Sequence, residues 1–208
     1  RRNKLKFISF NKWIFSFITI LFSTAVFAGL APDELVRKTA DDVISAIKSD
    51  KDIQGGDKKK IYQLAEEKIL PSFDFERISR LVLGKAWRKA TSQQKKQFKA
   101  EFRSLLLRTY SIALSKYKDQ GIKIKPMRMK PADEIVTVKT EIVQDGAQPI
   151  KVNYALAKNR DSWLVFDIII EGVSLVTNYR SQFSSEIRKG GMDSLNKKLA
   201  NKNKSNKD

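Results

Sequence analysis

The chain contains neither cysteine nor histidine. Without cysteine no disulfide can hold the fold, so its stability must come from a packed core, which 208 residues are enough to build. Without histidine a Ser-His-Asp triad and a Cys-His pair are both impossible, and the usual zinc ligands are missing. The sequence also contains no P-loop and no glycine-rich dinucleotide-binding motif. These absences exclude most catalytic classes and leave only carboxylate, lysine or tyrosine chemistry.

The first 28 residues have the order of segments found in a secretory signal peptide. Five basic residues and no acidic one come first, an apolar run follows at 13–22, and small or apolar residues lead to Ala28. Val26 and Ala28 suit the positions before a cleavage site, and Gly29 and Ala31 offer a second choice. Spanning a bilayer takes about 20 residues, so the run is short for the alternative, a retained membrane anchor. We therefore expect residues 1–28 to be a signal peptide and the mature protein to be exported.

The mature chain is strongly basic. Without the five basic residues of the first 28, the 41 basic residues fall to 36 against 23 acidic ones, a net charge of +13. Such a chain is attracted to anionic surfaces, but export and the lack of a recognisable nucleic-acid-binding motif argue against nucleic acid. One cluster is a candidate docking or headgroup surface, with a solvated helix face as the alternative: Lys85, Arg88, Lys89, Lys95 and Lys96.

Apolar residues recur at helical spacing over much of the mature chain. Thr91 and Gln94 form a capping-box pattern that opens the longest helix. From Leu105 onward this helix is apolar on more than one side, so its second half should lie between a sheet and other helices. The other predicted helices are 33–48, 58–70 closed by Pro71, 73–83 stopped by Gly84, 178–189 and, after Gly190-Gly191, 193–200, with a loop at 49–57.

From Gly121 the apolar period changes from 3.6 to 2, which indicates strands. The apolar faces of the last three strands fall on even numbers, and directly opposed residues of an antiparallel pair point to the same face. For even-numbered residues of two strands to oppose each other, the loop between the strands must have an odd number of residues, as at 145–147 and 159–161. An antiparallel meander with one apolar face, flanked by helices, predicts the α+β class. The four predicted strands are 121–130, 134–144, 148–158 and 162–171, and 171–176 is expected to wrap back over the fourth.

Two segments of the mature chain carry a resemblance to a known family. The first comprises Ile69-Leu70-Pro71, Phe73-Asp74-Phe75, Leu81-Val82-Leu83-Gly84-Lys85, Trp87-Arg88, Ala90-Thr91 and Phe102-Arg103 through Tyr110. The second comprises Trp163, Phe166-Asp167, Glu171-Gly172-Val173-Ser174, Tyr179-Arg180-Ser181-Gln182-Phe183, Arg188-Lys189-Gly190-Gly191-Met192-Asp193 and Leu195. In this combination and order, over roughly residues 32–200, the chain resembles the MlaC family of Gram-negative bacteria.

The resemblance implies a fold and a function. The fold would have helices packed on a strongly curved four-stranded antiparallel sheet, with an NTF2-like shape enclosing an apolar pocket. Residues 29–200 would form a single lipid-binding domain, followed by a disordered basic tail at 201–208. The protein would be a monomeric, non-enzymatic phospholipid carrier of the periplasm without a cofactor. Its partners would be an MCE-domain subunit of an inner-membrane ABC transporter and an outer-membrane lipoprotein–porin complex, and it would contribute to outer-membrane lipid asymmetry.

Candidate contacts for the lipid tails lie on the even-numbered sheet face, on the helices and in the wrap-back segment. An apolar stripe is equally what an ordinary filled core looks like, so core packing is the alternative for each of these residues. The candidates are Leu81, Leu106, Tyr110, Leu114, Val136, Val138, Val152, Tyr154, Phe166, Ile168, Val173, Leu175 and Val176.

Two acidic residues, Asp167 and Glu171, stand in an otherwise apolar run. An acid in such a place can be a catalytic group with a raised pKa. However, no second acid or base accompanies them at a spacing typical of a catalytic pair. We expect each to pair with Arg180, Arg188 or a backbone N–H, because buried acids are usually paired. An enzyme and a protein-binding adaptor without lipid therefore remain as alternatives to the carrier.

Overall fold

A computed structural model describes residues 29–117 and 119–205, so the predicted signal peptide lies outside the described residues. The helices are α1 (Pro32–Ser49), α2 (Lys51–Gln54), α3 (Lys58–Leu64), α4 (Phe75–Leu83), α5 (Lys85–Lys89), α6 (Ser92–Ser115) and α7 (Leu175–Ser205), with a π-helical segment η1 (Ala65–Ile69) and a 3-10 turn η2 (Leu70–Ser72) after α3. The strands are β1 (Gly121–Ile124), β2 (Ile135–Val143), β3 (Ile150–Asn159), β4 (Ser162–Ile170) and β5 (Val173–Ser174).

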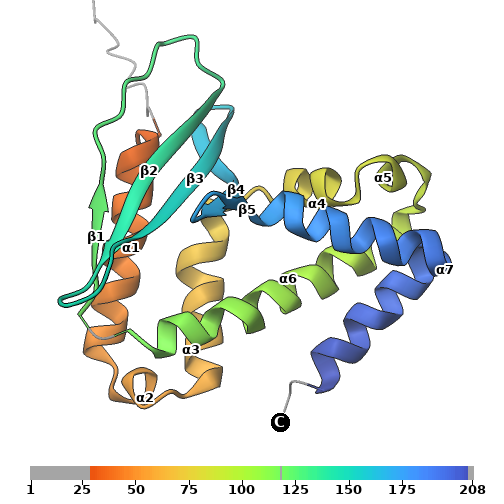
Figure 1. Cartoon of the computed structure of the whole chain (residues 1–208), viewed down its shortest axis with the longest axis horizontal. Helices are drawn as coiled ribbons and strands as arrows, with labels where there is room; N and C mark the ends of the chain where they lie inside the picture. The colour runs from red at the N-terminus through yellow and green to blue at the C-terminus, as the bar shows by residue number, and fades with distance from the viewer. Residues whose placement is uncertain (1–28, 118, 206–208) are drawn as a thin grey trace, which may run out of the picture.

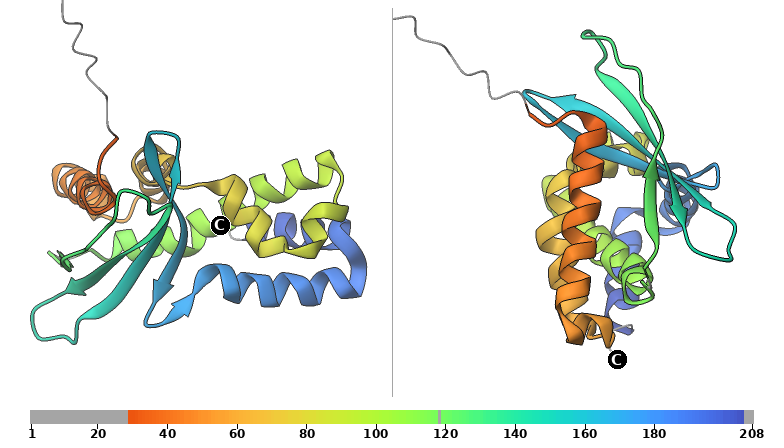
Figure 2. Two further views of the ribbon diagram at one scale, coloured as in Figure 1. Left: turned by 90° about the horizontal axis from the view of Figure 1, so that it is seen from above. Right: turned by 90° about the vertical axis from the view of Figure 1, so that its left-hand side faces the viewer.

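The elements form a sheet covered on one face and a group of helices that extends away from its edge (Figure 1). Helix α1 packs on β1 and β2 and on η1. Helix α7 leaves the sheet at β5 and packs against α4, α5 and α6, and α6 runs from that group back to α3 (Figures 1 and 2). Within the described residues no helix combines the length and the apolar character needed to span a bilayer.

The helices of the first half begin and end where the chain supplies the right residues. Pro32 occupies the first turn of α1, and acidic residues follow it at the positive amino end. Thr91 Oγ1 accepts from the backbone N–H of Gln94 at 3.2 Å, and the Gln94 side chain accepts from Thr91 N–H at 3.0 Å. The predicted capping box is therefore confirmed. Gly84 ends α4 with φ 53°, as predicted, because this conformation strains any residue with a Cβ.

The predicted helix at 58–70 and the loop at 49–57 need corrections. The helix changes from α to π at Ala65, which adds an extra residue to that turn, and 3-10 geometry follows at Leu70. The loop contains the short helix α2, whose first turn is capped by the Asp50 side chain. A further short helix, α5, fills the gap between the predicted helices at 73–83 and from Thr91.

The sheet is antiparallel throughout, in the order β1-β2-β3-β4-β5. The α+β class and the meander are confirmed, but the expectation of four strands in a strongly curved sheet is wrong: the described residues form five strands, and the sheet is not strongly curled. The fifth strand is part of the predicted wrap-back segment. Glu171 and Gly172, with φ 48° and 83°, form a two-residue turn that folds β5 onto β4. Strand β1 ends before Pro126 rather than at 130, because proline cannot donate to the ladder.

The predicted register is correct between β2 and β3 and only partly correct between β3 and β4. Ile142 pairs with Ile150, so even residues oppose even ones as predicted. At the next turn Asn159 pairs with Ser162, so the loop has two residues and the predicted three-residue loop at 159–161 is wrong. A β-bulge corrects the resulting one-residue slip, because Ala155 opposes Asp167 while Leu156 opposes Val165. Phe166 is the extra residue, and beyond it even again opposes even.

Helix α7 contains a kink at Gly191, whose φ of 73° is not helical, where the sequence predicts a break. The helix then continues through 201–205, which the sequence assigns to a disordered tail. Asn203 is buried there, and its Nδ2 donates to the backbone oxygen of Glu101 at 2.9 Å, which fixes this last turn against α6. Residues 206–208 lie outside the described residues.

Candidate functional site

A large cavity lies where the sheet, α1, the η1–η2 segment after α3, α6 and the start of α7 meet. It contains about 400 Å³ of space open to water, and about 1750 Å³ of non-atom space when its open side is included. Pockets that hold small molecules usually have about 300–1,000 Å³. Three separate core clusters surround this space, one in the helical group, one between α1 and the sheet, and one around α2 and α3. The apolar stripes are therefore partly filled core and partly the wall of a cavity.

Strands and helices both contribute to the walls. A strand presents every second side chain to the cavity, and a helix about every third or fourth. The sheet contributes its inner face, with Ile142, Val152, Tyr154, Ile168 and Ile170 at every second position. Helix α1 contributes its amphipathic stripe, and α6 contributes the second apolar side noted in the sequence. The residues from α1 are Leu35, Val36, Thr39, Ala40, Val43, Ile44 and Ile47, and those from α6 include Phe102, Leu106, Leu107, Tyr110 and Leu114.

Two local irregularities add residues to the wall. The π-helical turn η1 brings Ala65 and Ile69 to the cavity together with Leu70. The β-bulge brings Val165 and Phe166 to it as neighbours, although adjacent strand residues normally face opposite sides. The guanidinium of Arg77 lies 4.5 Å from the centre of the Phe166 ring. Irregular geometry thus gives the cavity more apolar wall than regular elements of the same length would.

One end of the cavity is closed by the core between α1 and the sheet. Along the inner face of β3, Ile150 is 49% exposed, Val152 and Tyr154 line the cavity, and Leu156 is fully buried. Val138, which lies opposite Tyr154 on β2, is also fully buried. Near the start of β3, the side chain of Gln120, a residue of the cavity wall, donates to Oε1 of Gln144 at 3.1 Å.

Most polar groups on the wall have partners inside the protein. The hydroxyls of Thr39 and Ser72 lie 3.2 Å apart, and the Ser111 hydroxyl donates to the backbone oxygen of Leu107. Burial raises the pKa of the Tyr110 hydroxyl, and a hydrogen bond with Tyr179 raises it further. An apolar cavity tolerates polar groups only when they are paired in this way, since an unpaired one loses its hydration.

Among the described residues of the wall, one is charged, Asp167. Its Oδ1 accepts from the backbone N–H of Val176 at 3.0 Å, and its Oδ2 accepts from the Ser174 hydroxyl at 2.5 Å. Ser174 also caps α7 by accepting from Thr177 N–H at 3.0 Å. The carboxylate is thus held at the positive amino end of a helix, and of the partners expected from the sequence a backbone N–H is the one it has. Glu171 is exposed, and its carboxylate accepts from the backbone N–H of Lys151.

The same cavity offers no arrangement for catalysis or for a metal. Asp167 has no second acid or base beside it on the wall, and its oxygens are already occupied. In the described part of the chain no three acidic, histidine or cysteine side chains gather as metal ligands would. What the geometry can do is enclose a large apolar molecule.

Comparison with known proteins identifies the family. A family model described as MlaC protein matches residues 37–201. The chain belongs to the MlaC family. The resemblance read from the two sequence segments is therefore confirmed.

Relatives of this MlaC-family protein are known by sequence and by structure. It is 24% identical over 202 residues to the intermembrane phospholipid transport system binding protein MlaC of Haemophilus influenzae, with 94% of each chain covered. It is 25% identical over 167 residues to the toluene tolerance protein ttg2D of Pseudomonas putida, covering 80% of this chain and 77% of that one. A solved structure of the phospholipid-binding protein from Ralstonia solanacearum, in complex with a phospholipid, has a TM-score of 0.81 and 34% identity, covering 86% of this chain and all of that one.

Nine of the thirteen residues selected from the sequence line the cavity of this MlaC-family protein. They come from the even-numbered sheet face, from α6 and from the start of α7. These nine are Leu106, Tyr110, Leu114, Val152, Tyr154, Phe166, Ile168, Leu175 and Val176. Their contact with a lipid tail remains a prediction.

The other four lie elsewhere. Val136 and Val138 point to the inner face as predicted, but they are buried in the core between α1 and the sheet. Leu81 packs against the helical core and does not line the cavity. Val173 is 58% exposed, because the β4–β5 turn reverses the chain there and leaves this side chain at the surface.

The sequence reading missed the whole contribution of α1 and of the α3–η1–η2 segment. The α1 stripe was visible as a period of 3.6, but a period shows only that a face is buried and not what lies opposite it. Nothing in the sequence pattern marked Ile69, Leu70 or Phe73 as wall residues, although all three belong to the segments that carry the family resemblance.

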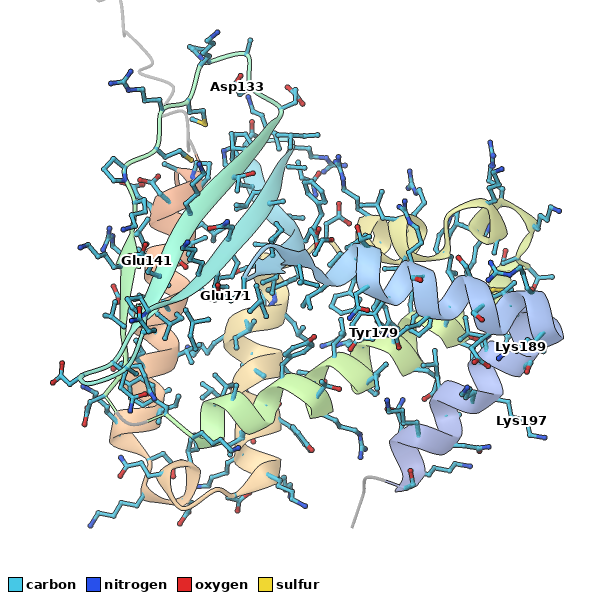
Figure 3. All side chains as sticks on the ribbon, viewed as in Figure 1. Asp133, Glu141, Glu171, Tyr179, Lys189 and Lys197 are labelled. Atoms are coloured by element: carbon cyan, nitrogen blue, oxygen red, sulfur yellow. The ribbon has the colours of Figure 1, made fainter. Side chains whose placement is uncertain are left out.

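The basic cluster at 85–96 lies away from the cavity. Lys95 Nζ is 5.2 Å from the centre of the Trp87 ring, while Lys85, Arg88, Lys89 and Lys96 are exposed. None of the five lines the cavity. Lys189 and Lys197 lie on α7, also far from the sheet (Figure 3). A docking role for this end of the molecule remains a prediction.

Proposed function

We propose that this MlaC-family protein is a carrier that holds one phospholipid molecule with its tails in the cavity and its headgroup at the mouth near Ile150. The observation that carries the proposal is the wall itself. Among its residues Asp167 alone is charged, and that carboxylate is bound to the amino end of α7. The Ralstonia solanacearum relative, described as phospholipid-binding and solved in complex with a phospholipid, supports the choice of ligand.

The energetics favour enclosure over exposure. A phospholipid with two tails has about 30 methylenes, and exposing each to water costs about 0.8 kcal/mol. A carrier must therefore bury nearly the whole of both tails, or the lipid could not leave a bilayer. A headgroup, in contrast, is best left in water, so we place it at the exposed end of the inner face of β3, near Ile150.

The cellular compartment and the partner proteins belong to the same proposal. A predicted signal peptide and a family whose Haemophilus influenzae relative is named for intermembrane phospholipid transport support action in the periplasm. We propose that the protein exchanges phospholipid with an inner-membrane ABC transporter that has an MCE-domain subunit, and with an outer-membrane lipoprotein–porin complex. It would thereby contribute to outer-membrane lipid asymmetry, as a monomer without a cofactor and without enzymatic activity.

A transfer assay tests the carrier function. Donor vesicles with radiolabelled phosphatidylethanolamine and unlabelled acceptor vesicles are separated by a membrane that only protein can cross. The protein should move label to the acceptor at a rate proportional to its concentration, and heat-denatured protein should not. If a folded protein leaves the rate at its background value, an adaptor that binds only protein partners replaces the carrier.

A further inference from the structure

One hydroxyl on the cavity wall differs from all other polar groups there. Nine polar side chains line the cavity, and eight have a partner among the described residues. Five of these pairings are given above, including the pair formed by Tyr110 and Tyr179, and Tyr117 is hydrogen-bonded to Lys48. Tyr154 has no hydrogen-bonding partner in the part of the chain that the structure describes.

Tyr154 also lies in the middle of the sheet. It lies in the middle of β3, on the inner face, between Val138 of β2 and Ile168 of β4. Along the strand it is four residues from the exposed Ile150, where we propose the mouth, or about 13 Å at about 3.3 Å per residue. Neither neighbouring strand offers a polar side chain at these paired positions.

The hydroxyl of Tyr154 still faces open space. The fully enclosed side-chain oxygens without a partner, within the described residues, are those of Ser79, Asn196 and Asn203. Tyr154 Oη is not one of these enclosed oxygens. It is therefore accessible to a ligand in the cavity that Tyr154 lines. Burial raises the pKa of Tyr154, and no hydrogen bond or charge opposes this effect. The phenol therefore stays protonated and can donate.

An unpaired donor in an apolar cavity is costly, and the cost falls away when a ligand supplies an acceptor. The acceptor must lie below the headgroup, because Tyr154 is well inside the mouth. In a diacyl phospholipid the groups between the headgroup and the tails are the two ester carbonyls, and a carbonyl oxygen is a good acceptor. An ether-linked lipid has the same shape and the same tails but lacks these carbonyls.

We infer that Tyr154 Oη–H donates a hydrogen bond to an ester carbonyl of the bound lipid and so selects ester-linked over ether-linked phospholipid. The inference rests on the proposed carrier function. It makes Tyr154 a specificity-determining residue rather than only a part of the apolar wall. A net hydrogen bond of this kind corresponds to a preference of about two- to tenfold.

A competition between two lipids tests this. The purified protein is incubated with vesicles that contain equal amounts of dihexadecanoyl-phosphatidylglycerol and its di-O-hexadecyl analogue. It is then reisolated, and mass spectrometry of the extract gives the ratio of the two bound lipids. Wild type should hold the diester in about two- to tenfold excess, and Tyr154→Phe should bring the ratio close to one. Tyr62→Phe is the matched control: Tyr62 does not line the cavity and its ring lies 6.0 Å from the guanidinium of Arg108, so the wild-type ratio should persist.

The outcomes separate the inference from the proposed function. A wild-type ratio of one overturns the inference without any variant, and so does a folded Tyr154→Phe protein that keeps the wild-type preference. In both cases lipid is bound, so the carrier function stands. A wild type that takes up neither lipid overturns the proposed function and, with it, the inference.

Discussion

The backbone N–H of Val176 donates to Oδ1 of Asp167 at 3.0 Å, which joins strand β4 to the first turn of α7 at the cavity wall. The Ser174 hydroxyl binds the other carboxylate oxygen and caps the same helix. This carboxylate therefore links the sheet to the helical group at the amino end of a helix, where a negative charge is stabilised.

Replacing Asp167 should loosen this junction. Asp167→Ala removes the acceptor and leaves the Val176 N–H without a partner, so we expect the free energy of unfolding to fall by about 2–3 kcal/mol. Asp167→Asn keeps one acceptor oxygen and should lose about 1 kcal/mol. Urea denaturation of both variants measures the effect. Asp161→Ala, an exposed control, should change the free energy by less than about 0.5 kcal/mol. If Asp161→Ala and Asp167→Ala lower the free energy of unfolding equally, the hydrogen bonds of Asp167 do not stabilise the junction between β4 and α7.

A charge placed on the inner face of β3 should empty the cavity. Val152→Glu puts an unpaired carboxylate among the tails, which costs several kcal/mol, so bound lipid should fall at least about tenfold. Asn153→Glu, the next residue on the opposite face of the strand, should keep the wild-type amount. Phosphorus analysis of the purified, folded variants gives lipid per protein. If Val152→Glu retains its lipid, the cavity is not where the tails lie.

Sequence reasoning located most elements because their signals are local. The Thr91–Gln94 capping box, the stop at Gly84 and the change of period at Gly121 each depend on a few adjacent residues. The even-numbered face of β2 and β3 followed from alternation alone. Helix faces and strand faces are properties of short segments, and these predictions were confirmed.

The cavity and the bulge could not be predicted in the same way. Val138 and Val152 show the same alternation, yet one is packed in a core and the other lines the cavity. Their difference depends on which strand a helix covers: α1 packs on β2, the strand of Val138, and that contact is a long-range property. The bulge at Phe166 follows from the two-residue turn at Arg160-Asp161, since only an extra residue restores the register. A three-residue loop would pair even residues with even residues without a bulge, so the alternation of the sequence could not distinguish the two arrangements.

The aromatic core of the helical group should carry much of the stability. Phe98 is fully buried, and its ring lies 5.3 Å from that of Phe102 and 5.6 Å from that of Phe183. Phe98→Ala should lower the free energy of unfolding by about 3–5 kcal/mol. Met129→Ala, at an exposed position, should change it by less than about 0.5 kcal/mol. Chemical denaturation is the measurement, and a loss below about 1 kcal/mol for Phe98→Ala would show that this cluster is not a rigid core.

Stability should be insensitive to pH over the neutral range. The chain has no histidine and no cysteine, so no side chain with an ordinary pKa titrates between about pH 5 and pH 8. The free energy of unfolding should therefore form a plateau there, measured by urea denaturation at a series of pH values. A step near pH 6.5 would contradict this reading.

The decrease of the free energy of unfolding at acid pH should depend on Lys60. Its Nζ lies 2.8 Å from Asp50 and 2.7 Å from Asp52, and its hydrogen bond holds the pKa of Asp50 below the usual range. A carboxylate with a lowered pKa stabilises the fold above its unfolded pKa, and this contribution is lost as the pH falls below about 4. Lys60→Gln should make the fall shallower. Since the pKa of Lys60 is raised in turn, its contribution is lost only above about pH 10.

Native mass spectrometry of the exported protein, purified from the periplasm without detergent, tests the central claim most directly. The account predicts a folded protein with an added mass equal to one cellular phospholipid, which organic solvent removes. A folded protein that shows the mass of the polypeptide alone, and still does so after incubation with phospholipid vesicles, would contradict the carrier.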